Sequence, residues 1–233
     1  MIAYKKVIKI CSLVMLLSGI VILATTLYPI FSYEWEAEQK YPRLLSPLVD
    51  TETASFKFST KDYTKLNNWF DEQKIKNTDT SDVATFYTVS IPKLNIDNAI
   101  VKLGGEDLSN SLIQFPGTAV PGTIGNAVIF GHSVLPQYFD PKRYLTIFST
   151  LNKLDIGDKI YIFYEGSTLQ YEVADMFEVA PKDIQVLEQS TADSYISLVT
   201  CAPPGHPLKP RRLIIRAKLK LNTGFNKEGM KNG

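Results

Sequence analysis

Cys201, His132 and Arg212 are the residues of this chain whose types and positions suit covalent chemistry. Cys201 closes a strand-like run that begins at Ile196, and His132 follows another apolar run across a single glycine. Arg212 comes after a proline-rich loop that starts just behind Cys201. A thiolate is the nucleophilic form of cysteine, an imidazole can transfer protons, and a guanidinium can hold an oxyanion. The set predicts a cysteine nucleophile with an acid-base partner and an oxyanion-stabilising group.

Each of these residues also has an ordinary structural interpretation. A lone cysteine is most often a buried, inert thiol, and a histidine at a strand end is often only hydrogen-bonded there. Arg212 stands beside Arg211, which is equally available, but the residues that follow Arg212 in its strand are apolar. The second histidine, His206, lies in the stiff loop behind Cys201, where a solvated side chain is the simpler interpretation.

The apolar N-terminal segment decides whether Cys201 has a disulfide partner. Residues 10–33 carry no charge and follow three lysines, which predicts a transmembrane helix with its N-terminus in the cytoplasm. Cys11, the other cysteine, would then lie at the inner edge of the bilayer, out of reach of Cys201. A cleaved signal peptide is the alternative, but its apolar core has only about 7–15 residues.

The chain divides into five expected segments. They are a cytoplasmic N-terminus (1–9), a transmembrane anchor (10–30), an extracytoplasmic spacer (31–82), a β-barrel domain (83–222) and a disordered tail (223–233). Within the spacer, Leu66, Trp69 and Phe70 have helical spacing and predict a short amphipathic helix packed on the main domain. The formal net charge of +1 gives no argument for nucleic-acid binding.

Short apolar runs separated by Gly, Pro, Asn and Asp fill the region after residue 82, which is typical of a barrel or sandwich. The clearer expected strands are Phe86–Ile91, Ala99–Leu103, Ala127–Phe130, Lys159–Tyr164, Leu169–Val179, Ser194–Thr200 and Arg212–Leu221. Glu165 and Gly166 predict a hairpin turn. Helical propensity is confined mainly to Asp107–Ile113 and Tyr144–Leu151. In the last strand, alternate residues from Leu213 form an apolar face.

Three segments, in order, resemble the signatures of sortases, the membrane-anchored cysteine transpeptidases of bacterial surfaces. They are Phe130-Gly131-His132-Ser133, Ser197-Leu198-Val199-Thr200-Cys201 and Arg212-Leu213-Ile214-Ile215-Arg216-Ala217. The resemblance covers roughly residues 88–219 and implies a mainly β fold: a closed sortase-like barrel with short helices behind one transmembrane helix. It also implies a single-pass protein of the plasma membrane with an extracytoplasmic catalytic domain.

The resemblance assigns roles to the candidate residues. Cys201 would attack the Thr-Gly carbonyl of an LPXTG-like sorting signal on a surface protein and form a thioester. His132 would act as general acid and then base, while Arg212 would orient substrate and stabilise the oxyanion. Val199 and Thr200 are expected to line the groove. The acceptor would be an amine, such as that of a cell-wall precursor or a protein lysine.

Some features depart from the family pattern or leave it open. Ser197 replaces the usual threonine, and no Asp-Pro-aromatic lid motif precedes the barrel, which argues against pilus assembly. The stretch 180–193 resembles the loop that selects the sorting signal. No cofactor is expected: Glu106 and Asp107 lie where some relatives contribute to a calcium site, but two adjacent carboxylates are usually a solvated turn.

Two other functions remain open from the sequence. One is a different extracytoplasmic cysteine peptidase or transpeptidase; L,D-transpeptidases, however, usually place His and Gly directly before the cysteine, where this chain has Val199 and Thr200. The other is a membrane-tethered β-domain that binds an envelope partner, with Cys201 merely buried. In that case alanine at Cys201 or His132 would affect stability but no reaction.

Overall fold

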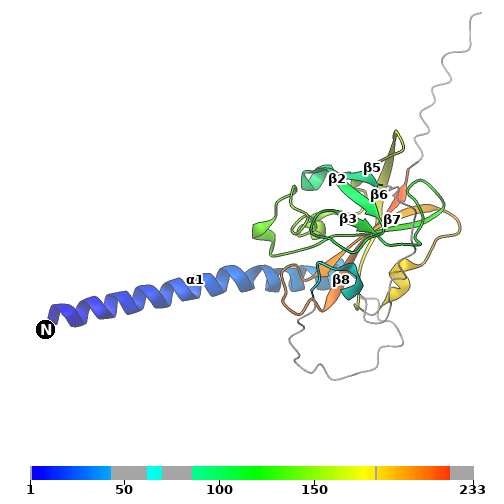
Figure 1. Ribbon diagram of the computed structural model, residues 1–233. Coiled ribbons are helices and arrows are strands. Elements are labelled where there is room, and N and C mark those ends of the chain that lie inside the picture. Colours follow the sequence, from blue (N-terminus) through cyan, green and yellow to red (C-terminus); the bar gives the residue numbers. More distant parts are fainter. Residues whose placement is uncertain (1, 43–61, 70–85, 182, 221–233) are drawn as a thin grey trace, which may run out of the picture.

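The computed structural model describes residues 2–42, 62–69, 86–181 and 183–220, and it consists of one long helix and one barrel (Figure 1). The helix, α1, spans Ile2–Lys40. The strands are β1 (Phe86–Ile91), β2 (Ile96–Leu103), β3 (Leu112–Gln114), β4 (Gly125–Phe130), β5 (Lys159–Tyr164), β6 (Ser167–Val179), β7 (Ser194–Ala202) and β8 (Arg211–Leu219). Short 3-10 helices are η1 (Leu66–Asn68), η2 (Pro92–Leu94), η3 (Pro136–Tyr138), η4 (Leu151–Lys153) and η5 (Ile184–Leu187).

The eight strands close into a barrel in the order β1-β2-β3-β4-β7-β8-β6-β5. The pairs β2–β3 and β4–β7 are parallel and the other neighbours are antiparallel. Closure leaves no free sheet edge among the eight strands described. The expected fold, a mainly β closed barrel preceded by one apolar N-terminal helix, is confirmed.

Two apolar clusters lie on the two sides of the strands that carry the candidate residues. Ala127 and Ile129 of β4 join the cluster inside the barrel, whereas Val128 and Phe130 join a second cluster on its outer wall. The same alternation places Cys201 on the outer wall. Because both faces of β4 are buried, its sequence is an apolar run rather than an alternating one.

Some predicted elements differ from the observed ones. Asp107–Ile113 is a turn that leads into the short strand β3, and Tyr144–Leu151 consists mainly of turns. The helix expected around Leu66 is the single-turn η1, whose Leu66 and Trp69 are buried as predicted, while Phe70 lies outside the described residues. The expected tail, 223–233, also lies outside them. The hairpin is confirmed, with its two turn residues at positive φ.

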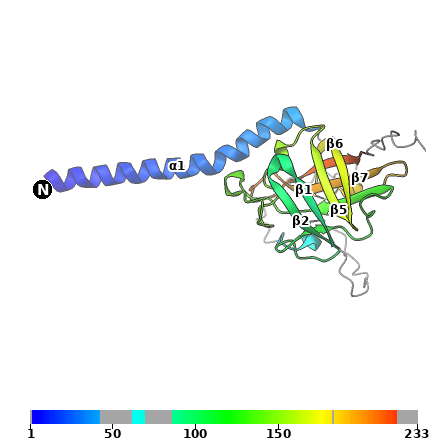
Figure 2. The ribbon, with the colours of Figure 1, turned by 90° about the horizontal axis from the view of Figure 1, so that it is seen from above.

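Helix α1 continues past the anchor expected to end at residue 30 and packs against the barrel. Its segment Ile8–Lys40 is long and apolar enough to cross a membrane. Tyr33, Ala37 and Tyr41 are buried in the main core cluster. Pro29 lies inside the helix, which curves as it approaches the barrel (Figure 2). The first residues of the expected spacer are therefore a docked continuation of the helix.

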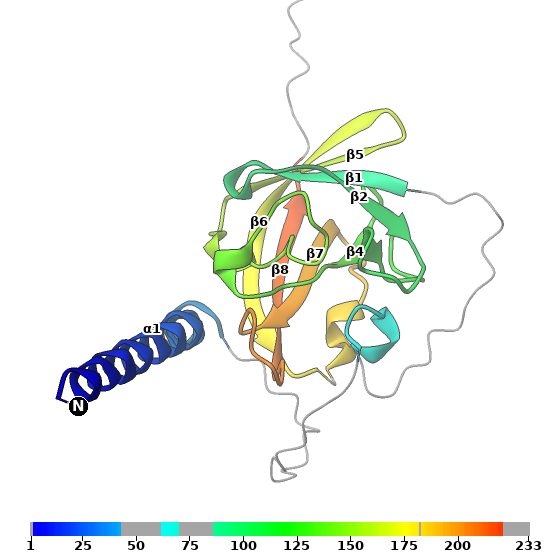
Figure 3. The ribbon, with the colours of Figure 1, turned by 60° about the vertical axis from the view of Figure 1, so that its left-hand side comes forward.

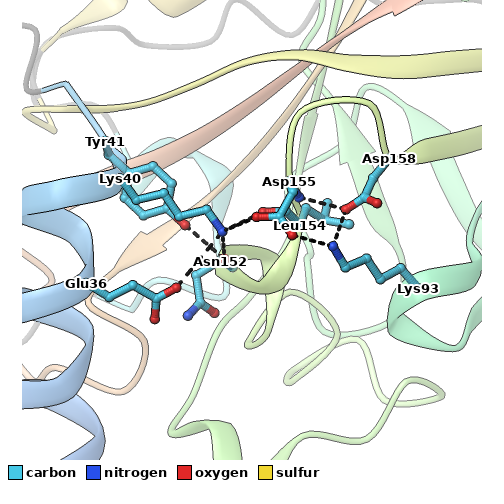
Figure 4. Close-up of polar contacts among 8 residues, drawn as sticks. All are labelled: Glu36, Lys40, Tyr41, Lys93, Asn152, Leu154, Asp155 and Asp158. Atoms are coloured by element: carbon cyan, nitrogen blue, oxygen red, sulfur yellow. Dashed lines mark hydrogen bonds and ion pairs between the residues drawn. The ribbon is translucent and has the colours of Figure 1, made fainter.

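Polar contacts complete this docking at the end of α1. The Lys40 ammonium lies 2.8 Å from Asp155 Oδ1 and donates to the carbonyls of Asn152 and Leu154 (Figure 4). Lys93 holds Asp155 from the other side at 2.6 Å. The two lysines lower the pKa of Asp155 to about 2. Because exposed ion pairs typically contribute only about 0–1 kcal/mol, the apolar burial of the helix supplies most of the docking stability and these pairs its orientation.

Candidate active site

The ends of β4 and β7 place His132 and Cys201 at one rim of the barrel. The two parallel strands are in register through Phe130 and Val199. Beyond that pair, the Gly131 amide donates to the Val199 carbonyl at 3.1 Å, and the Ser133 hydroxyl donates to the Cys201 carbonyl at 2.8 Å. The turn that carries His132 is therefore fastened to the strand that carries Cys201.

Gly131 is required by the space around this turn. A Cβ at that position would lie 2.5 Å from Phe148 and 2.6 Å from Leu112. Side-chain atoms cannot approach so closely without displacement. The glycine therefore lets the chain pass between two buried side chains before His132 begins.

Arg212 lies directly across the β7–β8 ladder from Cys201. Arg212 is 1% exposed, and both Cys201, its partner in the ladder, and Ile214, two residues further along β8, belong to the outer-wall cluster. Nη1 donates to the carbonyls of Lys209 (3.0 Å) and Arg211 (3.1 Å), and Nη2 donates to the carbonyl of Trp69 (3.2 Å). The guanidinium is thus held at the site by carbonyl oxygens.

Arg211, the other arginine that the sequence offered for the role of Arg212, forms ion pairs away from Cys201. Its guanidinium lies 2.7 Å from the buried carboxylate of Glu178 and 2.6 Å from Glu34 of α1. Tyr33 donates to the same Glu178 at 2.6 Å. Arg211 therefore joins the barrel to α1, and Arg212 is the arginine beside Cys201.

A covering segment, residues 62–69, lies over this rim. Trp69 is 1% exposed, with its ring centroid 6.0 Å from that of His132 and 5.1 Å from the Arg212 guanidinium carbon. Backbone hydrogen bonds to Glu106 and Leu108 fasten the segment to the barrel. Figures 1 and 3 show η1, drawn in cyan, against the outer side of the barrel near η5. The sequence predicted that this segment packs on the main domain, but not that it covers the candidate active-site residues.

Lys209 is a second cation near the site, and no motif in the sequence indicated it. Its ammonium lies 4.2 Å from the ring centroid of Tyr63 in the covering segment. Burial lowers the pKa of Lys209, and its charge lowers the pKa of both Cys201 and His132. The β7–β8 loop thus adds positive charge next to Arg212.

Burial under the covering segment favours the neutral forms of both reactive groups. It lowers the pKa of His132 from 6.5 to about 4, with a further contribution from the charge of Lys209. It raises the pKa of Cys201, against the attraction of Arg212 and Lys209 for the thiolate. His132 Nε2 has no hydrogen-bond partner among the described residues. The covered site therefore holds a neutral imidazole and a thiol at neutral pH.

The depressed pKa of His132 predicts a pH-dependent stability. In the unfolded state His132 has a pKa of 6.5 and binds a proton below that pH. In the folded state it binds the proton only near pH 4. The stabilisation is thus complete above pH 6.5 and is lost as the pH falls toward 4, by up to about 3 kcal/mol. Chemical denaturation of the wild type and His132→Gln across this window checks it. Parallel curves for the two proteins would contradict the assignment.

The other candidate residues are placed as follows. Val199 belongs to the same outer-wall cluster as Cys201 and is buried there. Thr200 lies on the opposite face of the strand, with its hydroxyl donating to the Gly131 carbonyl at 2.9 Å, a placement that gives no support to substrate contact. His206 accepts a hydrogen bond from Leu208 within its own loop. Asp107 accepts from Ser109 and Asn110, and no group of three or more metal-ligating side chains occurs in the described part of the chain.

Comparison with known proteins identifies the family. A model of the sortase domain matches residues 89–220, more than half of the chain. Sortase A of Streptococcus agalactiae is 25% identical over 139 residues, which are 59% of this chain and 54% of that protein. Sortase A of Bacillus anthracis is 28% identical over 150 residues, covering 60% and 67%. The chain belongs to the sortase family, and its match spans about half the length of the streptococcal relative.

Solved structures extend the likeness to several sortase types. A Clostridium perfringens sortase D5 transpeptidase is 29% identical with a TM-score of 0.50, covering 59% of this chain and 79% of that one. A lid mutant of sortase A from Corynebacterium diphtheriae is 30% identical with a TM-score of 0.52, covering 63% and 76%. Since different types match equally well, the likeness defines the family and no subclass.

Proposed function

We propose that this protein is a membrane-anchored cysteine transpeptidase that cleaves an LPXTG-like sorting signal through a thioester on Cys201. The observation that carries the proposal is the meeting of Cys201, His132 and Arg212 at one rim of a sortase-family barrel. The three residues come from three neighbouring strands or their ends, so the barrel itself fixes their relative positions. Helix α1 would hold the domain on the outer face of the plasma membrane, with residues 1–9 in the cytoplasm.

In the proposed reaction, the Cys201 thiol gives its proton to His132 as its sulfur attacks the Thr-Gly carbonyl carbon. Arg212 donates to the oxygen that becomes negative, and His132 delivers a proton to the departing glycine amine. The acceptor amine then loses a proton to His132 as it attacks the thioester, and Cys201 is regenerated. Transfer joins the surface protein to a cell-wall precursor or to a protein lysine.

The covering segment must move before substrate can bind. Arg212 Nη2 donates to the Trp69 carbonyl, so a main-chain carbonyl of this chain already occupies a donor meant for substrate. Removal of the segment would expose His132, which Trp69 covers, and would reduce the burial that favours the neutral forms of His132 and Cys201. Opening would therefore uncover the site and bring the pKa values closer to each other.

An open pocket beside the site suits part of the sorting signal. It has a volume of about 360 Å³ and lies between the β3–β4 connection and η5. Its lining includes Phe115, Pro116, Ile184 and Leu187, and it lies beside the outer-wall cluster that contains Val199. The apolar lining fits the leucine and proline of such a signal, and η5 belongs to the loop 180–193 that the sequence marked for specificity.

Trp69→Ala is expected to speed alkylation of Cys201 by iodoacetamide severalfold or more. The variant removes the ring that covers His132 and lies over Arg212, which opens a path to a thiol that is 1% exposed. The measurement is the alkylation rate at neutral pH in the full-length protein. Because unfolding would also expose the thiol, the melting temperature must stay well above the assay temperature. An unchanged rate in the folded variant would contradict a covering role for Trp69.

A ligation assay tests the proposed function as a whole. Full-length protein in nanodiscs is incubated with a fluorescent LPXTG-type peptide and triglycine, with the Trp69→Ala variant run in parallel. Formation of a peptide joined to triglycine supports the transpeptidase. Absence of both cleavage and ligation in the wild type and the uncovered variant, across a panel of related motifs, would overturn the proposal.

A further inference from the structure

Pro29 leaves a backbone carbonyl of α1 without its helical partner. In an α-helix the N–H of each residue bonds to the carbonyl four residues earlier, and proline has no N–H. The carbonyl released by Pro29 is that of Thr25, within the apolar stretch of the helix. The side-chain amide of Gln137, in the loop that follows β4, donates to this carbonyl at 3.3 Å. A loop of the barrel thus supplies the hydrogen bond that the helix lacks.

The level of this contact along α1 places it on the membrane side of the barrel. Glu34 is the first charged residue after the apolar stretch, and Thr25 lies about 13 Å before it at the usual helical rise. Tyr28, which lies between Thr25 and Glu34, and Trp35, which follows Glu34, are both 73% exposed. Tyrosine and tryptophan are enriched where a membrane meets water. Gln137 therefore contacts the helix at the expected outer interface of the bilayer, or on the acyl-chain side of it.

The docking of α1 keeps the loop at this level. Tyr33 and Tyr41 are buried against the barrel and Lys40 is tied to Asp155, so the barrel cannot slide away along the helix. In Figures 1 and 2 the light-green loop that contains η3 is the part of the barrel that extends furthest along α1 toward its N-terminus. The loop and the helix thus share one side of the molecule.

The side chains of this loop have the composition of a membrane-interface segment. Tyr138 is 63% exposed, and Leu145 further along is 38% exposed. Lys142 and Arg143 are also exposed, next to the single carboxylate of Asp140. An exposed aromatic ring with flanking basic residues suits the boundary between acyl chains and anionic headgroups.

We propose that the loop 136–143 is a lipid-binding surface that rests in the outer interfacial layer of the bilayer that α1 spans. The proposal depends on α1 crossing a membrane and not on the proposed reaction. Since the loop directly follows His132 and Ser133, it holds the active-site rim of the barrel close to the bilayer. Gln137 has a second role there, because it satisfies a carbonyl in the apolar stretch of the helix, where the acyl chains offer no hydrogen-bond donor.

Spin-label accessibility tests the lipid contact. A nitroxide is attached to Tyr138→Cys, to Lys142→Cys, or to the control Phe163→Cys, which is 51% exposed on β5, in a full-length Cys11→Ser/Cys201→Ala background. The protein is placed in nanodiscs of phosphatidylcholine and phosphatidylglycerol. We expect the ratio of oxygen to nickel-chelate collisions to be severalfold higher at 138 and 142 than at 163. Equal, water-like ratios at all three positions would overturn the proposal.

A double-mutant cycle tests the hydrogen bond itself. Pro29→Ala restores an N–H that can bond to the Thr25 carbonyl, so Gln137 then has nothing to satisfy. Gln137→Ala should lower the melting temperature of the reconstituted protein in the wild-type background and have little effect in Pro29→Ala. Equal effects of Gln137→Ala in the two backgrounds would contradict the role assigned to Gln137.

Discussion

Cys201→Ala is expected to abolish both cleavage and transfer while the barrel stays folded. No thioester can form without the thiol, and the nearest hydroxyl in the strand, that of Thr200, is committed to the Gly131 carbonyl. The change removes one buried atom without adding a polar group, so a loss of about 1 kcal/mol or less in stability is expected. Peptide cleavage and thermal unfolding of the full-length protein measure the two quantities.

Cys11→Ser is the matched control for this variant. Cys11 lies on the exposed surface of α1, far from the barrel, and should be replaceable without loss of turnover. Retention of full cleavage by Cys201→Ala would exclude Cys201 as the nucleophile. A loss of cleavage that accompanied unfolding would instead favour the alternative in which Cys201 is only a core residue.

His132→Ala is expected to lower turnover of an LPXTG-type peptide by about 10²–10⁴-fold, the usual contribution of a positioned acid or base. The amine leaving group must be protonated as the thioester forms, and no other imidazole is fastened to this rim. An activated ester that carries the same acyl peptide has a leaving group that needs no proton. The variant should therefore lose much less activity on the ester than on the peptide.

The comparison of the two substrates separates acid catalysis from structural damage. His132 supports the Trp69 ring, so its removal also disturbs the covering segment. Structural damage would reduce activity on both substrates alike, which would argue against an acid-base role. His206→Ala is the control histidine, and unchanged turnover is expected because its ring is occupied within the β7–β8 loop.

The sequence predicted the strands of the site because local patterns define them. β4 is an apolar run followed by a glycine, and β7 is a largely apolar run followed by a proline. The period-two alternation of β8 identified which of its faces enters the core. The order of three short signatures then brought Cys201, His132 and Arg212 to neighbouring strand ends. Strand β3 was missed because three residues are too few for a periodic signal and the preceding turn has helix-favouring residues.

Contacts between distant segments could not be predicted in the same way. The covering segment reaches the site through the backbone carbonyl and ring of Trp69, and a carbonyl carries no sequence signal for its partner. The docking of α1 depends likewise on single charged residues, such as Lys40, whose partners lie far along the chain. These contacts depend on where each loop leaves the closed barrel, which is known only once all eight strands are in place.

Intact-mass spectrometry of the full-length protein after incubation with an LPXTG-type peptide tests the thioester most directly. We expect a mass increase equal to the peptide fragment that ends at threonine, located on Cys201 by proteolysis, larger in Trp69→Ala and released by added triglycine. An adduct at a residue other than Cys201, or none in either protein across a panel of related motifs, would contradict the assignment of Cys201 as the nucleophile of a transpeptidase.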